Sequence, residues 1–323
     1  MAQKALAIHE LEDTEERIKA LKPKDSTSLK DLLRYDTARM FRTLVAMVSV
    51  GEAEQNQDES DYLFQLKQQS KHLSIFSIPK NELKYYQLDF TVPHEPGLCH
   101  IRNELYLAGG WIHYKYRTNF KRVSSTGAVI ALKSMPAGKS AFPLTYWKTE
   151  DSVLTVGGSN GSRLDEVTQF SQVKGEWKVL PPVLEKMSNC SATVLKDVLY
   201  CIGGIGSTNS VEWMELVSEK RRWSSIKRME VHTDFSDYYY RDATVVSNKI
   251  VFFASEETGF VLEGAASNLE VRSKFKGIEY ERGEHDSSFC THNGKVYFFP
   301  KDNYSQVFCL DVETDHCSHY FSQ

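Results

Sequence analysis

The chain has 323 residues, enough to bury a large core in one large domain or two smaller ones. Hydrophobic residues make up 41% of it and aromatic residues 12%, which is typical of a folded protein rather than a low-complexity one. The net charge of −4 gives no case for binding nucleic acid or an anionic membrane, and no apolar stretch approaches the length that crosses a bilayer.

The first residues, MAQKALAIHELEDTEERIK, are acidic and helical in pattern, so they resemble no secretory signal. The six cysteines stand at positions 99, 190, 201, 290, 309 and 317 without a CxxC pair. Such cysteines are expected to be reduced and buried in strands. We therefore predict a cytoplasmic protein, with association to the cytoskeleton as one setting.

Residues 1–50 are predicted to form a helical extension of two helices. Apolar residues recur at helical spacing up to Pro23, and Ser26, Thr27 and Ser28 then offer N-caps to a second helix over 28–49. Residues 51–61, GEAEQNQDESD, are polar and acidic, so they are expected to be a linker.

From about residue 62 to residue 323 the chain has strand composition, rich in Tyr, Phe, Val, Ile and Thr between short polar turns. Five copies of a four-strand unit can be aligned over 98–136, 142–183, 189–229, 240–277 and 287–323. An incomplete unit precedes them at 62–88, with outer strands LSIFSI and KYYQL and the segment YLFQL inside them.

A double glycine closes an apolar run in three of the copies, at 109–110, 157–158 and 203–204, so that the second glycines lie 48 and 46 residues apart. The last two copies, IVFFAS and VYFFPK, have lost it. A seven-residue interval in the outer hairpin extends further, as in Phe170–Trp177, Leu216–Trp223 and Leu310–Cys317. A period of this length made only of strands favours a propeller over a helical solenoid.

These residues resemble the Kelch family of β-propellers, whose unit has a strand, an apolar run ending in Gly-Gly, and a later Trp. Two copies match with both elements, whereas the first has Ile130 at the expected Trp position. The resemblance implies an all-β, Kelch-type propeller of five or six blades, with six favoured. Because Gln323 follows directly on the last outer strand, closure is expected from the N-terminal side, or one blade lacks a strand. The helix at 28–49 is a candidate to cover such an open edge.

The repeat positions are expected to be structural rather than functional. Paired glycines allow a close backbone approach, and a later Trp fills space between sheets. They are Gly109, Gly110, Gly157, Gly158, Trp177, Gly203, Gly204 and Trp223.

Catalytic signatures are missing from the sequence: it has no GxSxG, HExxH, P-loop or GxGxxG after a strand. His316, Cys317 and His319, and Cys290 with His292, are soft-metal ligand types, yet they lack paired spacing and fall within strand patterns. We therefore predict no catalytic residue, metal or cofactor.

The candidate binding residues lie in turns after the glycine position and between repeats, which gather on one face of a propeller. Tyr, Trp and Arg are enriched at interface hot spots. The candidates are Trp111, Tyr114, Tyr116, Arg117, Arg163, Asn209, Tyr238, Tyr239, Tyr240, Arg241, His285 and Tyr304.

Our leading hypothesis is a non-catalytic scaffold or subunit of a larger assembly, for example a cytoskeletal one, that binds protein partners through propeller loops and N-terminal helices. The alternative is a substrate receptor of a ubiquitin ligase; the 61 residues before the propeller are too few for the BTB and BACK domains that such receptors carry. A third hypothesis is a Kelch-type enzyme, such as a copper oxidase, whose ligand set cannot be matched here.

Overall fold

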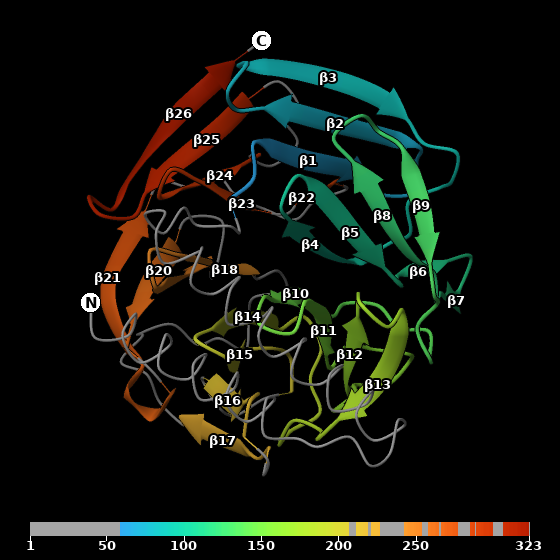
Figure 1. Cartoon of the computed structure of the whole chain (residues 1–323), viewed down its shortest axis with the longest axis vertical. Helices are drawn as coiled ribbons and strands as arrows, with labels where there is room; N and C mark the ends of the chain where they lie inside the picture. The colour runs from blue at the N-terminus through green and yellow to red at the C-terminus, as the bar shows by residue number, and fades with distance from the viewer. Residues whose placement is uncertain are drawn as a thin grey trace, which may run out of the picture. The chain divides into compact units, whose positions relative to one another are not determined.

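The chain is described by a computed structural model (Figure 1), which covers residues 59–206, 211–218, 221–226, 242–253, 258–264, 266–276, 285–287, 289–299 and 306–322. It divides into two compact units, residues 1–57 and 58–323. The predicted helices at 1–50 and most of the predicted linker at 51–61 lie outside the described residues. The description below is of the second unit.

Within the described residues, this unit contains six antiparallel sheets of four strands each. The sheets are arranged around a common axis as blades, with one short strand of each nearest the axis (Figure 1). The prediction of an all-β propeller with six blades is therefore confirmed.

Blades are numbered in chain order, and their strands are given from the axis outward. Blade 1 contains β22 (His285–Ser287), β1 (Tyr62–Lys67), β2 (His72–Ser77) and β3 (Glu82–Gln87); blade 2 contains β4 (Gly97–Ile101), β5 (Glu104–Ala108), β8 (Phe120–Ser124) and β9 (Val129–Leu132); blade 3 contains β10 (Leu144–Trp147), β11 (Ser152–Val156), β12 (Val167–Ser171) and β13 (Glu176–Leu180).

The remaining blades follow the same order. Blade 4 contains β14 (Ser191–Leu195), β15 (Val198–Ile202), β16 (Val211–Glu215) and β17 (Trp223–Ile226); blade 5 contains β18 (Asp242–Val246), β19 (Lys249–Phe253), β20 (Thr258–Glu263) and β21 (Glu270–Lys276), with the 3-10 turn η2 (Ala266–Asn268) before β21; blade 6 contains β23 (Cys290–His292), β24 (Lys295–Phe298), β25 (Gln306–Asp311) and β26 (His316–Ser322). A separate two-stranded hairpin, β6 (Trp111–Ile112) and β7 (Lys115–Tyr116), follows β5.

In blades 3 and 5 the second strand is the most deeply buried, because neighbouring blades cover both of its faces. Every residue of β11 and β19 is buried, although polar residues such as Ser152 and Thr155 are among them. The outermost strands are half solvated, and β13 buries only Leu180 fully. The core therefore consists of apolar layers between blades rather than one central cluster.

The double glycines lie at the ends of second strands. All six have positive φ, and at Gly157 (φ +57°) a Cβ would lie 2.6 Å from the Met187 carbonyl oxygen. The N–H of Gly110 donates to the Lys139 carbonyl, and that of Gly158 donates to the Met187 carbonyl, each at 2.9 Å. The missing side chain thus lets the chain that leads into the next blade cross the end of the second strand and hydrogen-bond to it.

The two tryptophans link adjacent blades. Trp177 of blade 3 donates its Nε1–H to the Lys133 carbonyl, and Trp223 of blade 4 donates to the Pro181 carbonyl, both at 2.8 Å. The prediction for Ile130 is wrong by one position. Val129 pairs with Val123 as Trp177 pairs with Phe170, and Ile130 is 48% exposed. A one-residue offset in a strand moves a side chain to the opposite face.

Blade 1 is closed in a way that the sequence did not indicate. Its outer strands lie close to where they were predicted, but its innermost strand is β22, which pairs antiparallel with β1 from Gln65 to Lys67. The chain therefore passes from blade 5 to blade 1, where residues 285–287 form the innermost strand, and then continues into blade 6. The prediction of closure from the N-terminal side is wrong, since β22 pairs with the inner edge of β1 that the helix at 28–49 was expected to cover.

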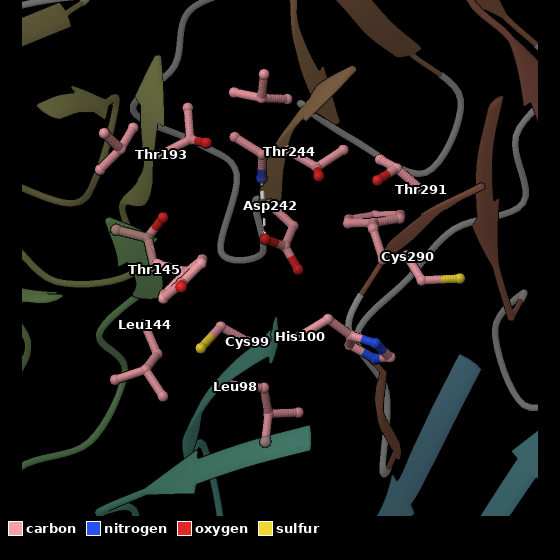
Figure 2. A pocket seen from close by; sticks show the side chains of 15 residues that line it. Leu98, Cys99, His100, Leu144, Thr145, Thr193, Asp242, Thr244, Cys290 and Thr291 are labelled. Atoms are coloured by element: carbon pink, nitrogen blue, oxygen red, sulfur yellow. Dashed lines mark hydrogen bonds between the residues drawn. The ribbon is translucent and has the colours of Figure 1, made fainter. Parts of the chain in front are cut away.

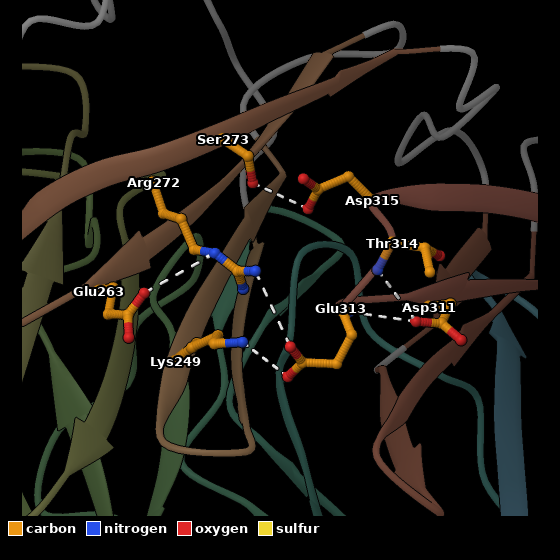
Figure 3. A network of polar contacts seen from close by, with 8 residues as sticks. All are labelled: Lys249, Glu263, Arg272, Ser273, Asp311, Glu313, Thr314 and Asp315. Atoms are coloured by element: carbon orange, nitrogen blue, oxygen red, sulfur yellow. Dashed lines mark hydrogen bonds and ion pairs between the residues drawn. The ribbon is translucent and has the colours of Figure 1, made fainter.

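A polar network joins blades 5 and 6 at their outer strands (Figure 3). Lys249 Nζ lies 2.6 Å from Glu313 Oε1, and Arg272 Nη2 lies 3.8 Å from Glu313 Oε2. Ser273 Oγ donates to Asp315 Oδ1 at 2.8 Å. The hydrogen bond from Lys249 lowers the pKa of Glu313, so the carboxylate is charged at neutral pH. Because Glu313 is exposed, each of its ion pairs is expected to contribute little to stability.

The crossing at the glycine pair makes a testable prediction. We expect Gly158→Ala to lower the free energy of unfolding by more than about 2 kcal/mol, because a Cβ there meets the Ser140 carbonyl at 2.8 Å and the Phe142 Cβ at 2.9 Å. Gly161→Ala is the matched control, since Gly161 has a similar φ of +100° but no atom within 4 Å of the added Cβ. Urea unfolding measures both. Equal losses would mean that backbone strain, and not the crossing, requires the glycine.

Candidate functional site

The clearest irregular feature of the propeller is the β6–β7 hairpin, which follows the first double glycine. Its two strands pair at Trp111 with Tyr116 and at Ile112 with Lys115. The two turn residues, His113 (φ 49°) and Tyr114 (φ 60°), both have left-handed backbone. Two-residue hairpin turns of this kind favour Asn-Gly, so a histidine and a tyrosine occupy these positions at a conformational cost.

The hairpin carries a stack of aromatic rings from its base to its tip. The His94 and Trp111 rings are stacked with centroids 4.8 Å apart, and Tyr114 lies over the Trp111 ring at 6.2 Å. Tyr114 is 94% exposed, the highest exposure among the described large hydrophobic residues that project from the surface. The Tyr114 ring thus lies beside the Trp111 ring while solvent reaches nearly its whole side chain.

The base of the hairpin is fixed by the chain segments that join the blades. His94 and Trp111 exchange two backbone hydrogen bonds of 2.9 Å, and the Arg117 N–H donates to the Gly110 carbonyl at 2.8 Å. A Cβ on Gly138 would lie 2.6 Å from the Tyr116 carbonyl oxygen, so the hairpin also packs closely on the segment before blade 3. The aromatic stack therefore projects from a rigid support.

Four of the predicted binding residues are thus brought together: Trp111, Tyr114, Tyr116 and Arg117. Tyr116 is 38% exposed, while the Nε atom of Arg117 is buried without a hydrogen-bond partner in the described part of the chain. The hairpin also carries Lys115. From 111 to 117 it has two formal positive charges and no carboxylate, and His113 adds a further basic group.

The other predicted binding residues do not join this group in the described structure. Arg163 is exposed in the loop after the second double glycine, where its side chain covers Gly206. His285 was expected in a turn but lies in strand β22, opposite Lys67. The remaining candidates, Asn209, Tyr238, Tyr239, Tyr240, Arg241 and Tyr304, lie outside the described residues.

Sequence reasoning did not detect the backbone ring that supports these loops. Glu95, Ala141 and Asn189 occupy equivalent positions before blades 2, 3 and 4, and all have positive φ between 46° and 53°. Ala141 N–H donates to the Glu95 carbonyl at 3.0 Å, and Asn189 N–H donates to the Ala141 carbonyl at 2.8 Å. The sequence could have indicated these positions only through their regular spacing, because Glu, Ala and Asn have no side-chain chemistry in common.

Lys139, in the segment between blades 2 and 3, is buried. Its Nζ lies 2.9 Å from Thr155 Oγ1 and 3.2 Å from Glu166 Oε1, above the Phe142 ring. Burial lowers the pKa of Lys139, and the Glu166 carboxylate opposes that shift. This lysine therefore supports the crossing between blades 2 and 3 rather than a contact surface.

A second candidate site is a cavity of about 130 Å³ on the propeller axis (Figure 2). Inner strands of five blades line it, and register places Cys99, Thr145, Thr193, Thr244 and Cys290 at equivalent positions. Burial raises the pKa of the Cys99 and Cys290 thiols, so neither is a thiolate at neutral pH.

His100 is the unusual residue of this cavity. Both of its ring nitrogens are buried, and neither has a hydrogen-bond partner within the described residues. Burial lowers the pKa of His100 to about 3, and the ring packs against Phe64 at 5.1 Å. The imidazole is therefore neutral. The described residues provide no group of three or more His, Cys, Asp or Glu side chains that could hold a metal ion.

Comparison with known proteins identifies the repeat. The Kelch motif family matches residues 186–230, which span blade 4 and its approach. This part of the chain is thus similar to a Kelch repeat, and the described fold is a six-bladed β-propeller. The chain is 28% identical to the mouse (Mus musculus) Kelch-like protein 35 over 109 residues, which are 33% of this chain. The match spans only 18% of that relative's length.

A solved structure titled "Structure of YjhT" has the same fold, with a TM-score of 0.54 over 82% of this chain and 97% of that chain. At 9% identity this likeness concerns the fold alone. Kelch propellers mostly mediate contacts between proteins. Among the described residues, no helix has the length and apolar character needed to cross a membrane.

The buried imidazole predicts a pH dependence. His100 has a folded pKa of about 3, below its ordinary 6.5, so unfolding takes up a proton between these values. Stability is therefore complete above pH 6.5 and falls as the pH decreases, by up to about 1.4 kcal/mol per pH unit. Urea unfolding of the wild type and of His100→Gln from about pH 7.5 to 5 isolates this group, because the other histidines are shared. Parallel curves for the two proteins would contradict the prediction.

Proposed function

We propose that this Kelch propeller is a non-catalytic interaction subunit that binds a protein partner through the β6–β7 hairpin. The observation that carries the proposal is the exposed ring of Tyr114, which lies beside the stacked rings of His94 and Trp111 on a strained but anchored turn. A rigid, amphipathic aromatic side chain gives large contact area at low entropic cost, as hot-spot residues do.

The charge of the hairpin limits the chemistry of the partner surface. Lys115 is exposed beside Tyr114, Arg117 stands at the base, and no acidic residue lies between 111 and 117. We therefore expect the partner to present acidic side chains around an apolar spot that receives the Tyr114 ring. Membership of a larger assembly, for example a cytoskeletal one, is part of this proposal, because a rigid aromatic surface of this kind suits a protein partner.

The test compares two exposed tyrosines. Tyr114→Asn removes the ring but keeps a residue type that tolerates left-handed backbone, so the hairpin should persist. Tyr85→Asn is the matched control, since Tyr85 is 57% exposed on the outer strand β3. Each full-length chain is tagged and purified from its own cells, and the proteins that accompany it are quantified by mass spectrometry.

We expect at least one protein to be recovered with the wild type and Tyr85→Asn but about tenfold less with Tyr114→Asn, since a hot-spot aromatic contributes about 1.4 kcal/mol or more. Thermal unfolding should be unchanged, because so exposed a ring contributes little to folding. Identical recovery from all three chains would reject the hairpin as the binding site. Recovery of a cullin among the lost proteins would favour the substrate-receptor role.

A further inference from the structure

A crevice lies between the outer hairpin of blade 1 and the β8–β9 turn of blade 2. It encloses about 150 Å³, several times the roughly 30 Å³ that one water molecule takes in the liquid. Lys80 and Lys84 of blade 1 line it, together with Tyr62 and Tyr86. Ser125 and Thr126 line the opposite wall.

The register of blade 1 explains why these groups share one face. Ile75 pairs with Lys84 and Ser77 pairs with Glu82, so alternate residues of β3 point toward blade 2. Tyr86, on the same face, packs against Gly127, where an added Cβ would lie 2.7 Å from the ring. Lys84 and Glu82 therefore lie on the wall that faces the β8–β9 turn, and Lys80, in the turn before β3, lines the same crevice.

The three hydroxyl residues of that turn have different partners. Ser124 Oγ accepts from the N–H groups of Thr126 and Ala128 at 3.3 and 3.2 Å, and it shares a hydrogen bond of 2.8 Å with Thr126 Oγ1. These two hydroxyls hold the turn. The Ser125 hydroxyl makes no hydrogen bond within the described residues, although Ser125 lines the crevice and is only half-buried.

We propose that Ser125 is a phosphorylation site and that the crevice receives the phosphoryl group, with Lys80 and Lys84 as its cations. In the transfer, Ser125 Oγ bonds to the γ-phosphorus of a nucleoside triphosphate held by a separate protein kinase. The bond between this phosphorus and the bridging oxygen breaks, and the nucleoside diphosphate leaves. The hydroxyl proton passes to a base of the kinase.

The consequence is a tie between the outer edges of blades 1 and 2. A phosphoserine carries close to two negative charges and three acceptor oxygens, which pair well with lysine ammonium groups. Glu82 at present pairs with Lys84 at 3.1 Å, but both side chains are about half exposed, so this pair is weak and can exchange. Blade 1 gains most, because β22 pairs with it over only three residues.

The experiment installs phosphoserine at position 125 of the full-length chain by genetic encoding. We expect the melting temperature to rise by about 2–4 °C, as one or two new charge-assisted bonds would produce in a domain of this size. Hydrogen exchange across 72–87 should slow as well. With Lys80→Gln and Lys84→Gln both gains should disappear, while Glu82→Gln should enlarge them by removing a competing carboxylate.

Two further results distinguish phosphorylation of Ser125 from the binding of a free anion in the crevice. Ser125→Ala should leave the melting temperature unchanged, since the hydroxyl has no partner to lose within the described residues. If inorganic phosphate stabilises the unmodified chain and phosphoserine does not, the crevice binds free anions and the modification is rejected. An equal gain with and without the two lysines would also overturn the proposal.

Discussion

The arrangement of this propeller depends on one close contact, where the chain entering a blade crosses the end of the preceding blade's second strand. At Gly109 and Gly157 the crossing backbone lies too near for a Cβ, which would meet the Lys139 and Met187 carbonyl oxygens. The N–H groups of Gly110 and Gly158 hydrogen-bond to the same two carbonyls. The ring of Glu95, Ala141 and Asn189 continues the same contact from blade to blade. Because all of these bonds join backbone atoms, the loops beyond them are free to vary while their bases stay fixed.

Closure of the propeller also depends on backbone hydrogen bonds, in this case between two strands. The first blade has only three strands from the N-terminal part of the described chain, which would leave the inner edge of β1 unpaired. The segment between blades 5 and 6 supplies the missing strand, β22, before the chain continues into blade 6. Blade 1 is thus joined to the C-terminal blades by hydrogen bonds as well as by side-chain packing, as between Phe76 and Phe321.

Much of the fold could be predicted from the sequence because it repeats. Glycines with a fixed period and strand composition between turns led to six blades, and the fourth blade coincides with the matched Kelch motif. Strand β22 escaped detection because HDS has no apolar residue, and it was assigned to a turn. The hairpin interval misled as well: Phe170 pairs with Trp177 seven residues away, but Trp223 pairs with Met214, nine residues away, because that turn is longer.

The site was harder to predict, because loop residue types do not reveal which side chains are buried. Lys139 and Tyr114 are both polar-tipped residues in segments between strands, yet one is 1% exposed and the other 94%. What separates them is the partner available: Glu166 and Thr155 lie within reach of Lys139, whereas Tyr114 stacks on the Trp111 ring beneath it. The partners of Lys139 come from the neighbouring blade, about 15 to 30 residues away in sequence, and no local pattern records them.

The two ends of the blades carry different structural features. The hairpin follows β5, and so lies at the end where the second strands finish. At the other end the Glu59 carboxylate accepts from the Gly294 N–H, the Asp61 carboxylate lies 3.3 Å from His292 Nδ1, and the Asp61 N–H donates to Asn103 Oδ1. Residue 59, where the described chain begins, is thus anchored at the β23–β24 turn, on the side opposite the hairpin.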